Sequence, residues 1–354
     1  MKAILSALAT ANPKRYATQR EIYEFLEAHF PMEQGERDLY RQLLLEGPIR
    51  GRYIAVDVDE EICSQDPDQL AWRFAKHARR IVVEAAQAAL ERAGLKATEI
   101  EGLIVNTCTG YLCPGLSSYV MEDLRLPAST SVLDLMGMGC GGAVPNLEAA
   151  CRMIQSGAKK TVLCLSVEIC SATFFLGPDP DLVVSNSIFG DGAAAAILRA
   201  NLNGDLPGGF VRFLDFESVT LPKYREDLRY TTKGGRLRNV LTRNVPAIGA
   251  RAVAQVTRRL LDRHGLSTDD IRWWVVHPGG TQVLQSVGKH LGLRRETLRF
   301  SYETFCDYGN MSSPSVLFVL DRILREAKPS AGETGLLLSF GAGFTAFAAL
   351  IEFC

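Results

Sequence analysis

The stretch LMGMGCGGAVPNLEAACRMI (residues 135–154) contains a turn with four glycines between the end of a strand-like segment and a helix-like segment. Cys140 lies in this turn, with a glycine on each side. Glycine allows sharp bends and lets a substrate approach main-chain N–H groups, which can stabilise an oxyanion. The start of a helix also lowers the pKa of a thiol, and the thiolate is the reactive form. A cysteine is more often a small buried hydrophobic residue, but the flanking glycines make Cys140 a candidate nucleophile.

The same plan occurs again about 170 residues later, in CDYGNMSSPSVLFVLDRIL (306–324), where a glycine-containing turn leads into another helix-like segment. Before these stretches, EIEGLIVNTCTG (99–110) matches DIRWWVVHPGG (270–280), and after them TVLCLS (161–166) matches GLLLSF (335–340). Such self-similarity indicates two halves built on one plan. In this alignment Asn310 is the counterpart of Cys140, and His277 is the counterpart of Asn106.

The segments of the repeat alternate between strand-like and helix-like patterns. This alternation predicts the α/β fold class, with helices layered on a largely buried sheet. The stretch at 201–209, rich in glycine and proline, is the clearest seam between the halves. We therefore expect an N-terminal half over residues 1–205 that contains the nucleophile and a C-terminal half over 206–354 that contains His277 and Asn310.

The composition excludes several classes of partner. The 39 Lys and Arg residues balance the 40 Asp and Glu residues, so no overall charge favours nucleic acid or an acidic membrane surface. No run approaches the roughly 18 apolar residues of a membrane span. The nine cysteines show no C-x-x-C spacing, which predicts reduced thiols, no metal site and a cytoplasmic location.

Two polar residues of the second half lie at the ends of predicted elements. His277 closes an apolar strand before Pro-Gly-Gly, and α/β proteins place catalytic groups at such strand tips, although a structural histidine is about equally common there. Asn310 starts a helix and would by itself be an ordinary N-cap. An amide donor beside an imidazole donor suits the enolate that forms when a malonyl group loses carbon dioxide.

A competing interpretation uses the same glycine turn. GMGCGG (137–142) fits the G-x-G-x-x-G pattern of dinucleotide-binding turns, so a nicotinamide-dependent oxidoreductase is an alternative. That fold also needs an acidic residue about 20 positions later. Glu168 lies about 30 positions later, and the fit is therefore poor.

At these motifs the sequence resembles the type III polyketide synthases, the chalcone synthase-like family of the thiolase superfamily. The similar motifs are GCGGA (139–143), FGDGAAAAIL (189–198), WVVHPGG (274–280) and GNMSSPSVLFVLD (309–321). The resemblance implies a homodimer with a thiolase-like fold, a layered αβαβα body that uses CoA thioesters as substrates and binds no permanent cofactor. It also implies that Cys140 carries the acyl group, that His277 activates Cys140, and that His277 and Asn310 support malonyl decarboxylation.

The resemblance further assigns residues around the substrate. Phe189 matches the gate between the entrance tunnel and the reaction cavity, and the second gating position falls on Asn239. The other residues that correspond to substrate-binding positions or to the cyclisation loop, here SFGAG (339–343), are Cys108, Thr109, Cys113, Thr173, Ser312, Gly341 and Gly343. The cavity-lining side chains among them are small, which favours an aliphatic starter over a ring-bearing one.

The segment that binds CoA in this family corresponds to residues 39–53. Its candidate contacts to CoA are Arg41, Arg50 and Arg52, whereas Gln42 and Glu46 occupy positions that are basic in plant members. A second hypothesis is therefore that the starter arrives on an acyl carrier protein, which docks against Arg41, Arg50 and Lys223.

The function expected from these features is that of a type III polyketide synthase, an acyltransferase. It loads an acyl starter on Cys140, condenses it with malonyl-CoA and releases a pyrone or a resorcinol/phenolic product. A ketoacyl synthase III-like enzyme that stops after a single condensation is the nearest alternative. The starter, the number of extensions and the mode of ring closure depend on the shape of the cavity.

Overall fold

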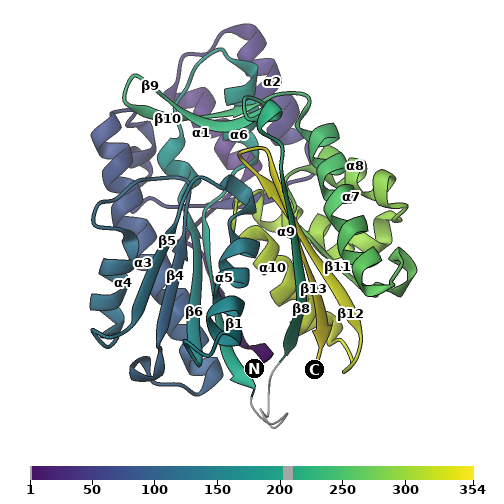
Figure 1. The fold of residues 1–354 in the computed structure, drawn as a ribbon. Helices are drawn as coiled ribbons and strands as arrows, with labels where there is room; N and C mark the ends of the chain where they lie inside the picture. The colour runs from purple at the N-terminus through teal and green to yellow at the C-terminus, as the bar shows by residue number, and fades with distance from the viewer. Residues whose placement is uncertain (1, 202–209) are drawn as a thin grey trace.

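The computed structural model describes residues 2–201 and 210–354. Its elements form a layered body, with the two ends of the chain close to each other (Figure 1). The strands are β1 (Lys2–Ala11), β2 (Arg15–Thr18), β3 (Gly51–Ile54), β4 (Gly102–Asn106), β5 (Ser131–Leu135), β6 (Thr161–Glu168), β7 (Gly192–Asn201), β8 (Val211–Thr220), β9 (Leu228–Lys233), β10 (Arg236–Leu241), β11 (Trp273–Val276), β12 (Thr334–Gly341) and β13 (Thr345–Phe353). The helices are α1 (Gln19–His29), α2 (Gln34–Leu45), α3 (Pro67–Ala93), α4 (Leu116–Leu124), α5 (Ala143–Gln155), α6 (Pro180–Ile188), α7 (Val245–His264), α8 (Thr281–Leu291), α9 (Arg299–Tyr308) and α10 (Ser315–Arg322).

Nine strands form one mixed sheet in the order β11-β12-β13-β8-β1-β7-β6-β4-β5. Its two parts, β1-β7-β6-β4 and β8-β13-β12-β11, repeat one topology of two antiparallel pairings followed by a parallel one. The parts join where Ile4 and Leu5 of β1 pair with Arg212 and Val211 of β8. This topology confirms the predicted thiolase-like α/β fold. The expected boundary between residues 205 and 206 lies outside the described residues.

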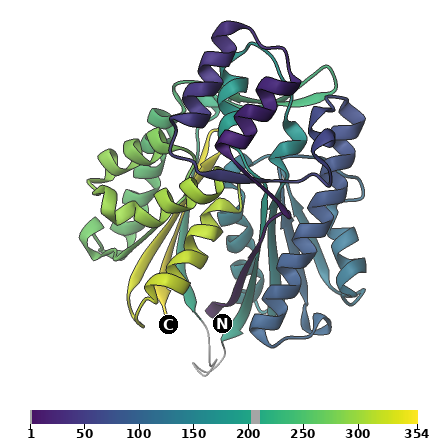
Figure 2. The ribbon, with the colours of Figure 1, turned by 180° about the vertical axis from the view of Figure 1, so that it is seen from behind.

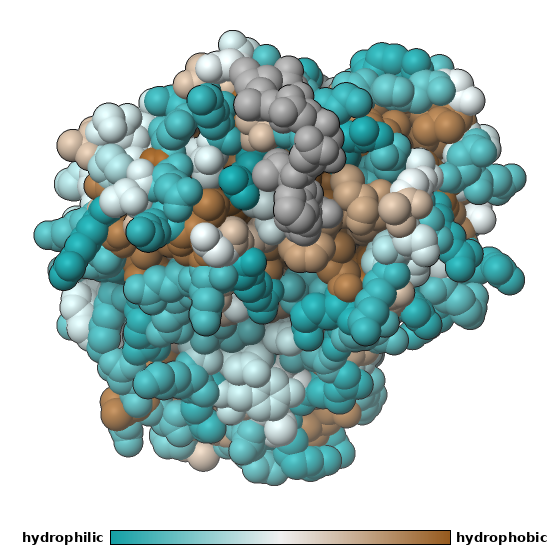
Figure 3. Space-filling model, turned by 90° about the horizontal axis from the view of Figure 1, so that it is seen from below, coloured by the Kyte–Doolittle hydropathy of each residue, from teal (hydrophilic) through white to brown (hydrophobic). Residues whose placement is uncertain are grey.

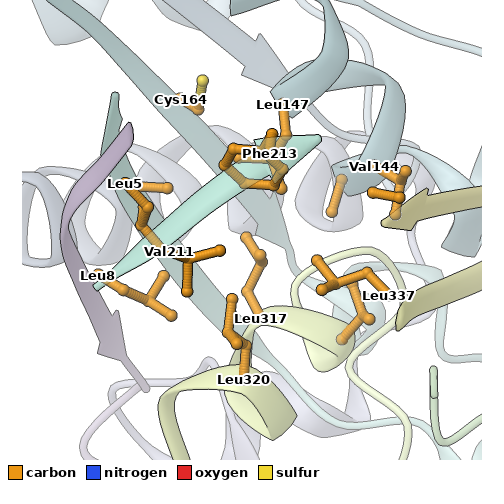
Figure 4. Close-up of a cluster of buried hydrophobic side chains, with 14 of the residues drawn as sticks. Leu5, Leu8, Val144, Leu147, Cys164, Val211, Phe213, Leu317, Leu320 and Leu337 are labelled. Carbon is orange, nitrogen blue, oxygen red and sulfur yellow. The ribbon is translucent and has the colours of Figure 1, made fainter. Parts of the chain in front are cut away.

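Helices cover both faces of each part of the sheet. α3 and α4 pack on the outer face of the first part, and α7 and α8 pack on the outer face of the second. α5 and α10 lie between the two parts in a central hydrophobic cluster. Figure 4 shows this cluster, with Val144 and Leu147 from α5, Leu317 from α10 and Phe213 from β8. The sequence of layers is therefore the expected αβαβα.

The pattern of buried residues explains why α5 forms where it does. Leu147, Ala150, Cys151 and Ile154 recur every three or four positions and are all buried, as expected of a helix that presents one apolar face to a core. Packing of this face holds the start of α5, and with it the turn before α5, against the sheet.

One end of the sheet is covered by a cap, the name used here for α1, α2, α6, the ribbon β2–β3 and the hairpin β9–β10. α1, α2, α6 and the hairpin β9–β10 lie together at the top of Figure 1, and α1 and α2 are again at the top of the reverse view in Figure 2. α1, α2, α6 and the ribbon β2–β3 share a small apolar core of their own. The opposite end, seen in Figure 3, is mostly hydrophilic, with hydrophobic side chains gathered in a band across its middle. None of the helices in the described ranges is both long and apolar enough to cross a membrane.

Candidate active site

Cys140 lies where a glycine turn packs against the end of β12. It belongs to a short 3₁₀ turn over Gly139–Gly141, directly before α5. Gly139 has a φ of 53°, in the left-handed region that favours glycine. Any side chain at Gly341 would collide with the main-chain carbonyl of Met138. Glycine at both positions therefore allows the turn and β12 to approach each other closely.

His277 directly follows β11 and is held by the neighbouring strand. Its main-chain N–H donates to the carbonyl oxygen of Leu338 in β12, at 2.8 Å. The imidazole is edge-on to Phe340, with ring centroids 6.1 Å apart. Its Nδ1 atom is buried and has no hydrogen-bond partner among the described residues. Because β12 ends at Gly341, the same strand supports His277 and the turn of Cys140.

Hydrogen bonds fix the amide of Asn310. Its Oδ1 accepts from the main-chain N–H of Ser312 at 2.8 Å, and its Nδ2 donates to the carbonyl oxygen of Gly279 at 3.3 Å. These two bonds show that Nδ2 of Asn310, and not Oδ1, faces the segment that follows His277. Interaction with the same side chain lowers the pKa of the Cys140 thiol. Asn310 therefore lies close both to the nucleophile and to the segment that carries His277.

Burial sets the protonation of the nucleophile and the imidazole. It raises the pKa of Cys140 to about 11, against hydrogen bonds with Ser312 and Asn310 that lower it. Burial also lowers the pKa of His277 to about 3. Both groups are thus neutral at pH 7 in the unliganded protein, and the expectation of a lowered thiol pKa is wrong for this state. A neutral imidazole is the form that can accept the thiol proton.

Cys140 lines a cavity of about 270 Å³ beneath the cap, which we call the reaction cavity. Four of the predicted substrate-binding residues line it together with Cys140, namely Cys108, Phe189, Asn239 and Ser312. They come from four separate segments of the chain, and only the fold brings them together.

A second cavity, of about 890 Å³, lies between α1, α6 and the ribbon β2–β3, and we call it the outer cavity. The predicted residue Thr173 lines it. Phe189 and Asn239 line both cavities. These two side chains thus stand between the outer cavity and the reaction cavity, and the gate role of Phe189 stays a prediction.

The remaining predicted substrate-binding residues lie outside both cavity walls. The hydroxyl of Thr109 donates to a buried carboxylate at 2.9 Å and accepts from the main-chain N–H of Ile169 at 2.9 Å. The hydroxyl of Thr109 thus has two protein partners, and a substrate contact of Thr109 stays a prediction. Cys113 is exposed, while Gly341 and Gly343 flank a residue of the reaction cavity wall. Substrate binding by these three stays a prediction.

The prediction of a CoA contact is wrong for Arg52. Its side chain is buried, with 4% of the residue exposed. The guanidinium donates to the side chain of Gln19 and to the main-chain carbonyls of Asn186 and Phe189. Arg52 therefore holds the segment that carries Phe189, and it is not available to a phosphate at the surface.

The other two arginines expected near CoA remain accessible. Arg41 is exposed on α2. Arg50 is also exposed, and it forms an ion pair with Asp307. Lys223, from the carrier-protein hypothesis, is exposed beside the ring of Tyr224. Contacts of these residues to CoA or to a carrier protein stay predictions.

Sequence reasoning missed the role of Glu168, a fully buried carboxylate behind the reaction cavity. It accepts hydrogen bonds from the main-chain N–H groups of Cys108 and Thr109, at 2.9 and 3.1 Å, and from the hydroxyl of Ser313, at 2.6 Å. Burial raises its pKa, against these hydrogen bonds. Glu168 thereby ties together segments from both halves of the repeat.

Tyr230 was also missed. It lies on β9 directly opposite Asn239 of β10, and it lines the reaction cavity. Burial raises the pKa of its hydroxyl. A side chain of this size in a small cavity limits the space next to Cys140.

We expect Glu168→Leu to destabilise the protein by about 3–5 kcal/mol. Leucine leaves several buried N–H and O–H donors without an acceptor, and each such donor costs about 1–3 kcal/mol. Equilibrium unfolding in urea measures the change. As a control, Glu148→Leu removes a partly exposed i,i+4 ion pair with Arg152, which should cost no more than about 1 kcal/mol. A Glu168→Leu protein as stable as the wild type would contradict the role of this carboxylate.

The glycine turn does not have the surroundings of a dinucleotide site. A side chain on Gly139 would lie 3.0 Å from the main chain of Ala342, and one on Gly141 would lie 2.8 Å from the ring of Phe347. Protein therefore fills the space that a pyrophosphate would need, and the dinucleotide interpretation is wrong. Among the described residues, no group of three or more His, Cys, Asp or Glu side chains could hold a metal ion.

Two family models match this chain. The family model of chalcone and stilbene synthases, C-terminal domain, matches residues 220–353, and that of FAE1/type III polyketide synthase-like proteins matches residues 50–205. The 3,5-dihydroxyphenylacetyl-CoA synthase of Streptomyces toyocaensis is 33% identical over 321 residues, which cover 88% of this chain and 82% of that protein.

A mycobacterial relative and a solved structure are similar over nearly the whole chain. The alpha-pyrone synthesis polyketide synthase-like Pks18 of Mycobacterium tuberculosis is 28% identical over 351 residues, 97% of this chain and 89% of that protein. The crystal structure of the 1,3,6,8-tetrahydroxynaphthalene synthase from Streptomyces coelicolor A3(2) superposes with a TM-score of 0.90 at 26% identity, covering 99% of both chains.

Proposed function

The chain belongs to the type III polyketide synthases of the chalcone and stilbene synthase family, which are acyltransferases, and on this basis we propose that it extends an acyl starter on Cys140 by decarboxylative condensation with malonyl-CoA. The observation that carries the proposal is the position of Cys140, which lines the reaction cavity together with four of the residues expected to bind substrate. The test is incubation with malonyl-CoA and a panel of acyl-CoA starters, with the products identified by mass spectrometry.

In the loading step, His277 acts as a general base. The neutral imidazole takes the proton of the Cys140 thiol as the sulfur attacks the thioester carbonyl of the starter. The carbon–sulfur bond to CoA breaks, the starter becomes a thioester of Cys140, and the CoA thiolate takes up the proton.

In the extension step, Asn310 and His277 stabilise the enolate that forms when malonyl-CoA loses carbon dioxide. Donors held in place before the reaction stabilise such a charge best in a dry site, and the amide of Asn310 is held by Gly279 and Ser312. The enolate carbon attacks the carbonyl carbon of the acyl-Cys140 thioester and forms the new carbon–carbon bond. The thiolate of Cys140 leaves and can accept the extended chain again.

The product class proposed is a pyrone or a resorcinol/phenolic ring. Among the similar proteins, one is named for alpha-pyrone synthesis and another for 3,5-dihydroxyphenylacetyl-CoA, which supports both product types. A single-condensation enzyme of the ketoacyl synthase III type remains the alternative. Counting the malonyl-derived carbons in the product separates the two, because more than one two-carbon unit requires repeated extension.

We expect Tyr230→Ala to yield products with more malonyl-derived units than the wild type. The substitution removes an aromatic ring from the wall of the reaction cavity, so a longer intermediate can stay beside Cys140 before it is released. Mass spectrometry of the products measures the shift. Tyr224→Ala makes the same chemical change outside this cavity wall and should leave the product distribution unchanged. An unchanged distribution in Tyr230→Ala would contradict a size limit set by this ring.

We propose that the starter is delivered as a CoA thioester or on an acyl carrier protein that docks near Arg41, Arg50 and Lys223. Exposed basic side chains support either source, since both carry phosphate groups. The rates of Cys140 acylation from matched CoA and carrier-bound thioesters distinguish them. Equal rates would count against a dedicated carrier-protein surface.

We also propose that the protein is a cytoplasmic homodimer. In the described part of the chain, β5 has a neighbour on one side only, and Val132, Met136 and Tyr111 nearby are exposed. Exposed strand edges with apolar side chains favour pairing with another chain. The nine cysteines are all described and are all free thiols, which supports a reducing compartment. Sedimentation equilibrium should give twice the mass of one chain, and the mass of a single chain would contradict the dimer.

A further inference from the structure

The main chain of Asn310 is bound on both sides to the segment that follows α6. The main-chain N–H of Asn310 donates to the carbonyl oxygen of Ile188 at 2.8 Å, and the main-chain N–H of Gly190 donates to the carbonyl oxygen of Asn310 at 3.0 Å. These two bonds form an isolated parallel bridge between Phe189 and Asn310. The position of the Asn310 amide therefore depends on how firmly the chain after α6 is held.

Arg52 of β3 holds the end of α6 in place. Its guanidinium donates to the main-chain carbonyl oxygen of Asn186, at 2.8 Å, and to that of Phe189, the residue after α6. The last carbonyl groups of a helix have no partner within the helix, and a cation at this end also interacts favourably with the helix dipole. The side chain of Gln19 accepts from Nε of Arg52 at 2.9 Å. The plane of the guanidinium is thus fixed by three acceptors.

The side chain of Arg52 also lies against the turn that leads to Asn310. A Cβ atom on Gly309 would lie 3.0 Å from Cδ of Arg52 and 2.5 Å from the carbonyl oxygen of Ile188. Gly309 has a φ of 67°, in the left-handed region that favours glycine. Because protein interiors are closely packed and transmit strain, a shift of Arg52 would move both the end of α6 and Asn310.

Arg52 keeps its charge although it is buried. Burial lowers the pKa of its guanidinium to about 10, against the carboxylate of Asp191, which raises it. The group is therefore protonated at pH 7. A buried charge is costly unless it is paired and hydrogen-bonded, and a planar fork of N–H donors can serve several acceptors at once. The three acceptors around Arg52 match this geometry.

We propose that Arg52 is a positioning residue for Asn310 in the decarboxylation of malonyl-CoA. Arg52 holds the end of α6, the bridge holds Asn310 to this segment, and the amide is thereby kept where the enolate forms. The inference rests on the proposed function and assigns the residue that fixes the geometry of its extension step. Cys140 lies in the turn before α5, which packs against β12, so acylation does not depend on the bridge.

Arg52→Met tests the proposal in the full-length protein, with malonyl-CoA and hexanoyl-CoA as probes. Methionine fills much of the space of the arginine stem but donates no hydrogen bond. The kcat for carbon dioxide release should fall by about 10–100-fold, because a displacement of about 1 Å can cost a factor of this size. The rate of Cys140 acylation by hexanoyl-CoA and the KM for malonyl-CoA should each change by less than about twofold, since Arg52 contacts neither the thiol nor CoA.

Arg73→Met is the matched control. Arg73 of α3 is also buried, with 2% of the residue exposed, and it also donates to two main-chain carbonyl oxygens, those of Ser171 and Glu61. These acceptors lie outside the two segments of the bridge. The ratio of carbon dioxide release to Cys140 acylation should therefore be the same in Arg73→Met as in the wild type. An equal fall of this ratio in both variants would show a general loosening of the fold and would overturn the proposal.

The effect of Arg52 should disappear once the amide has been removed. In the Asn310→Asp protein, the further change Arg52→Met should lower the remaining carbon dioxide release by less than about twofold, because residues that act through one group are not additive. A further loss as large as that in the wild-type background would show that Arg52 acts independently of Asn310, and it would overturn the proposal.

Arg52→Lys serves as the second variant if Arg52→Met does not fold. Lysine keeps the charge but lacks the planar fork, so it should show the same selective loss of carbon dioxide release at a smaller size. Equal losses of acylation and of carbon dioxide release, or a raised KM for malonyl-CoA at unchanged kcat, would overturn this inference and leave the proposed function intact. A wild-type protein that neither acylates Cys140 nor releases carbon dioxide would overturn both.

Discussion

Cys140→Ala is expected to lower kcat/KM for polyketide formation by at least about 10³-fold. No other group can form the acyl-enzyme in the geometry of the turn before α5, and loss of a nucleophile commonly costs this much or more. His277 and Asn310 are unchanged in the variant, so slow decarboxylation of malonyl-CoA should continue. Radiolabelled malonyl-CoA measures both reactions, as labelled product and as released carbon dioxide.

The Cys140→Ala experiment needs a control because a second thiol, that of Cys108, lies close to Cys140. Cys108 lines the same reaction cavity, but burial raises its pKa far above the usual thiol range and Glu168 accepts its S–H at 3.3 Å. It is therefore a poor substitute for the nucleophile. Cys63→Ala, outside both cavity walls, should leave condensation unchanged. Condensation at wild-type rate in Cys140→Ala would contradict the assignment of the nucleophile.

Asn310→Asp is expected to reduce the decarboxylation of malonyl-CoA by about 10²–10³-fold. The substitution replaces an amide donor by a carboxylate, which repels the enolate, and loss of one oxyanion donor commonly costs this factor in kcat. The starter should still acylate Cys140, because His277 remains as the base. Carbon dioxide release and acyl-enzyme formation, measured on the same sample, separate the two steps.

The structure around Asn310 also supplies a test of whether this effect is local. The main-chain N–H of Ser312 donates to Oδ1 of Asn310, and a carboxylate can accept this bond equally well. It cannot replace the bond from Nδ2 of Asn310 to the carbonyl oxygen of Gly279, so the variant should lose about 1–3 kcal/mol of stability in urea and still be folded in the assay. Unchanged decarboxylation in the folded variant would contradict a direct role for the amide.

Local sequence patterns are enough to select Cys140, His277 and Asn310 as candidate site residues. Each lies at a strand end or a helix start that is marked by glycine or proline. The internal repeat adds a constraint on where these residues lie in the fold. Positions that are equivalent in the two halves are expected near the junction of the halves. The same repeat predicts the sheet topology, in which four strands of the second half follow the order of four strands of the first.

The supporting residues do not have such local patterns. The groups that donate to Glu168 include the N–H of Thr109, 59 residues away, and the hydroxyl of Ser313, 145 residues away. Arg52 lies in a basic stretch of the kind that binds phosphate, yet the carbonyls at the end of α6 enclose it. Tyr230 reaches the cavity only because the hairpin β9–β10 folds over Cys140. These positions depend on packing between distant segments, which a single sequence does not display.

The protonation of the site likewise depends on burial. The position of Cys140 before α5 favours a low thiol pKa, but enclosure beneath the cap outweighs it and raises the pKa to about 11. The helix start can be recognised in the sequence, whereas the depth of the cavity cannot.

The most direct test of the central claim is to locate the acyl group on the protein. The wild-type protein is incubated with a single acyl-CoA starter and without malonyl-CoA, then digested and analysed by mass spectrometry. The account predicts one acyl group per chain, on the peptide that contains Cys140, and its discharge into product when malonyl-CoA is added. An acyl group on Cys108 or on any other residue, or product formation without acylation of Cys140, would contradict it.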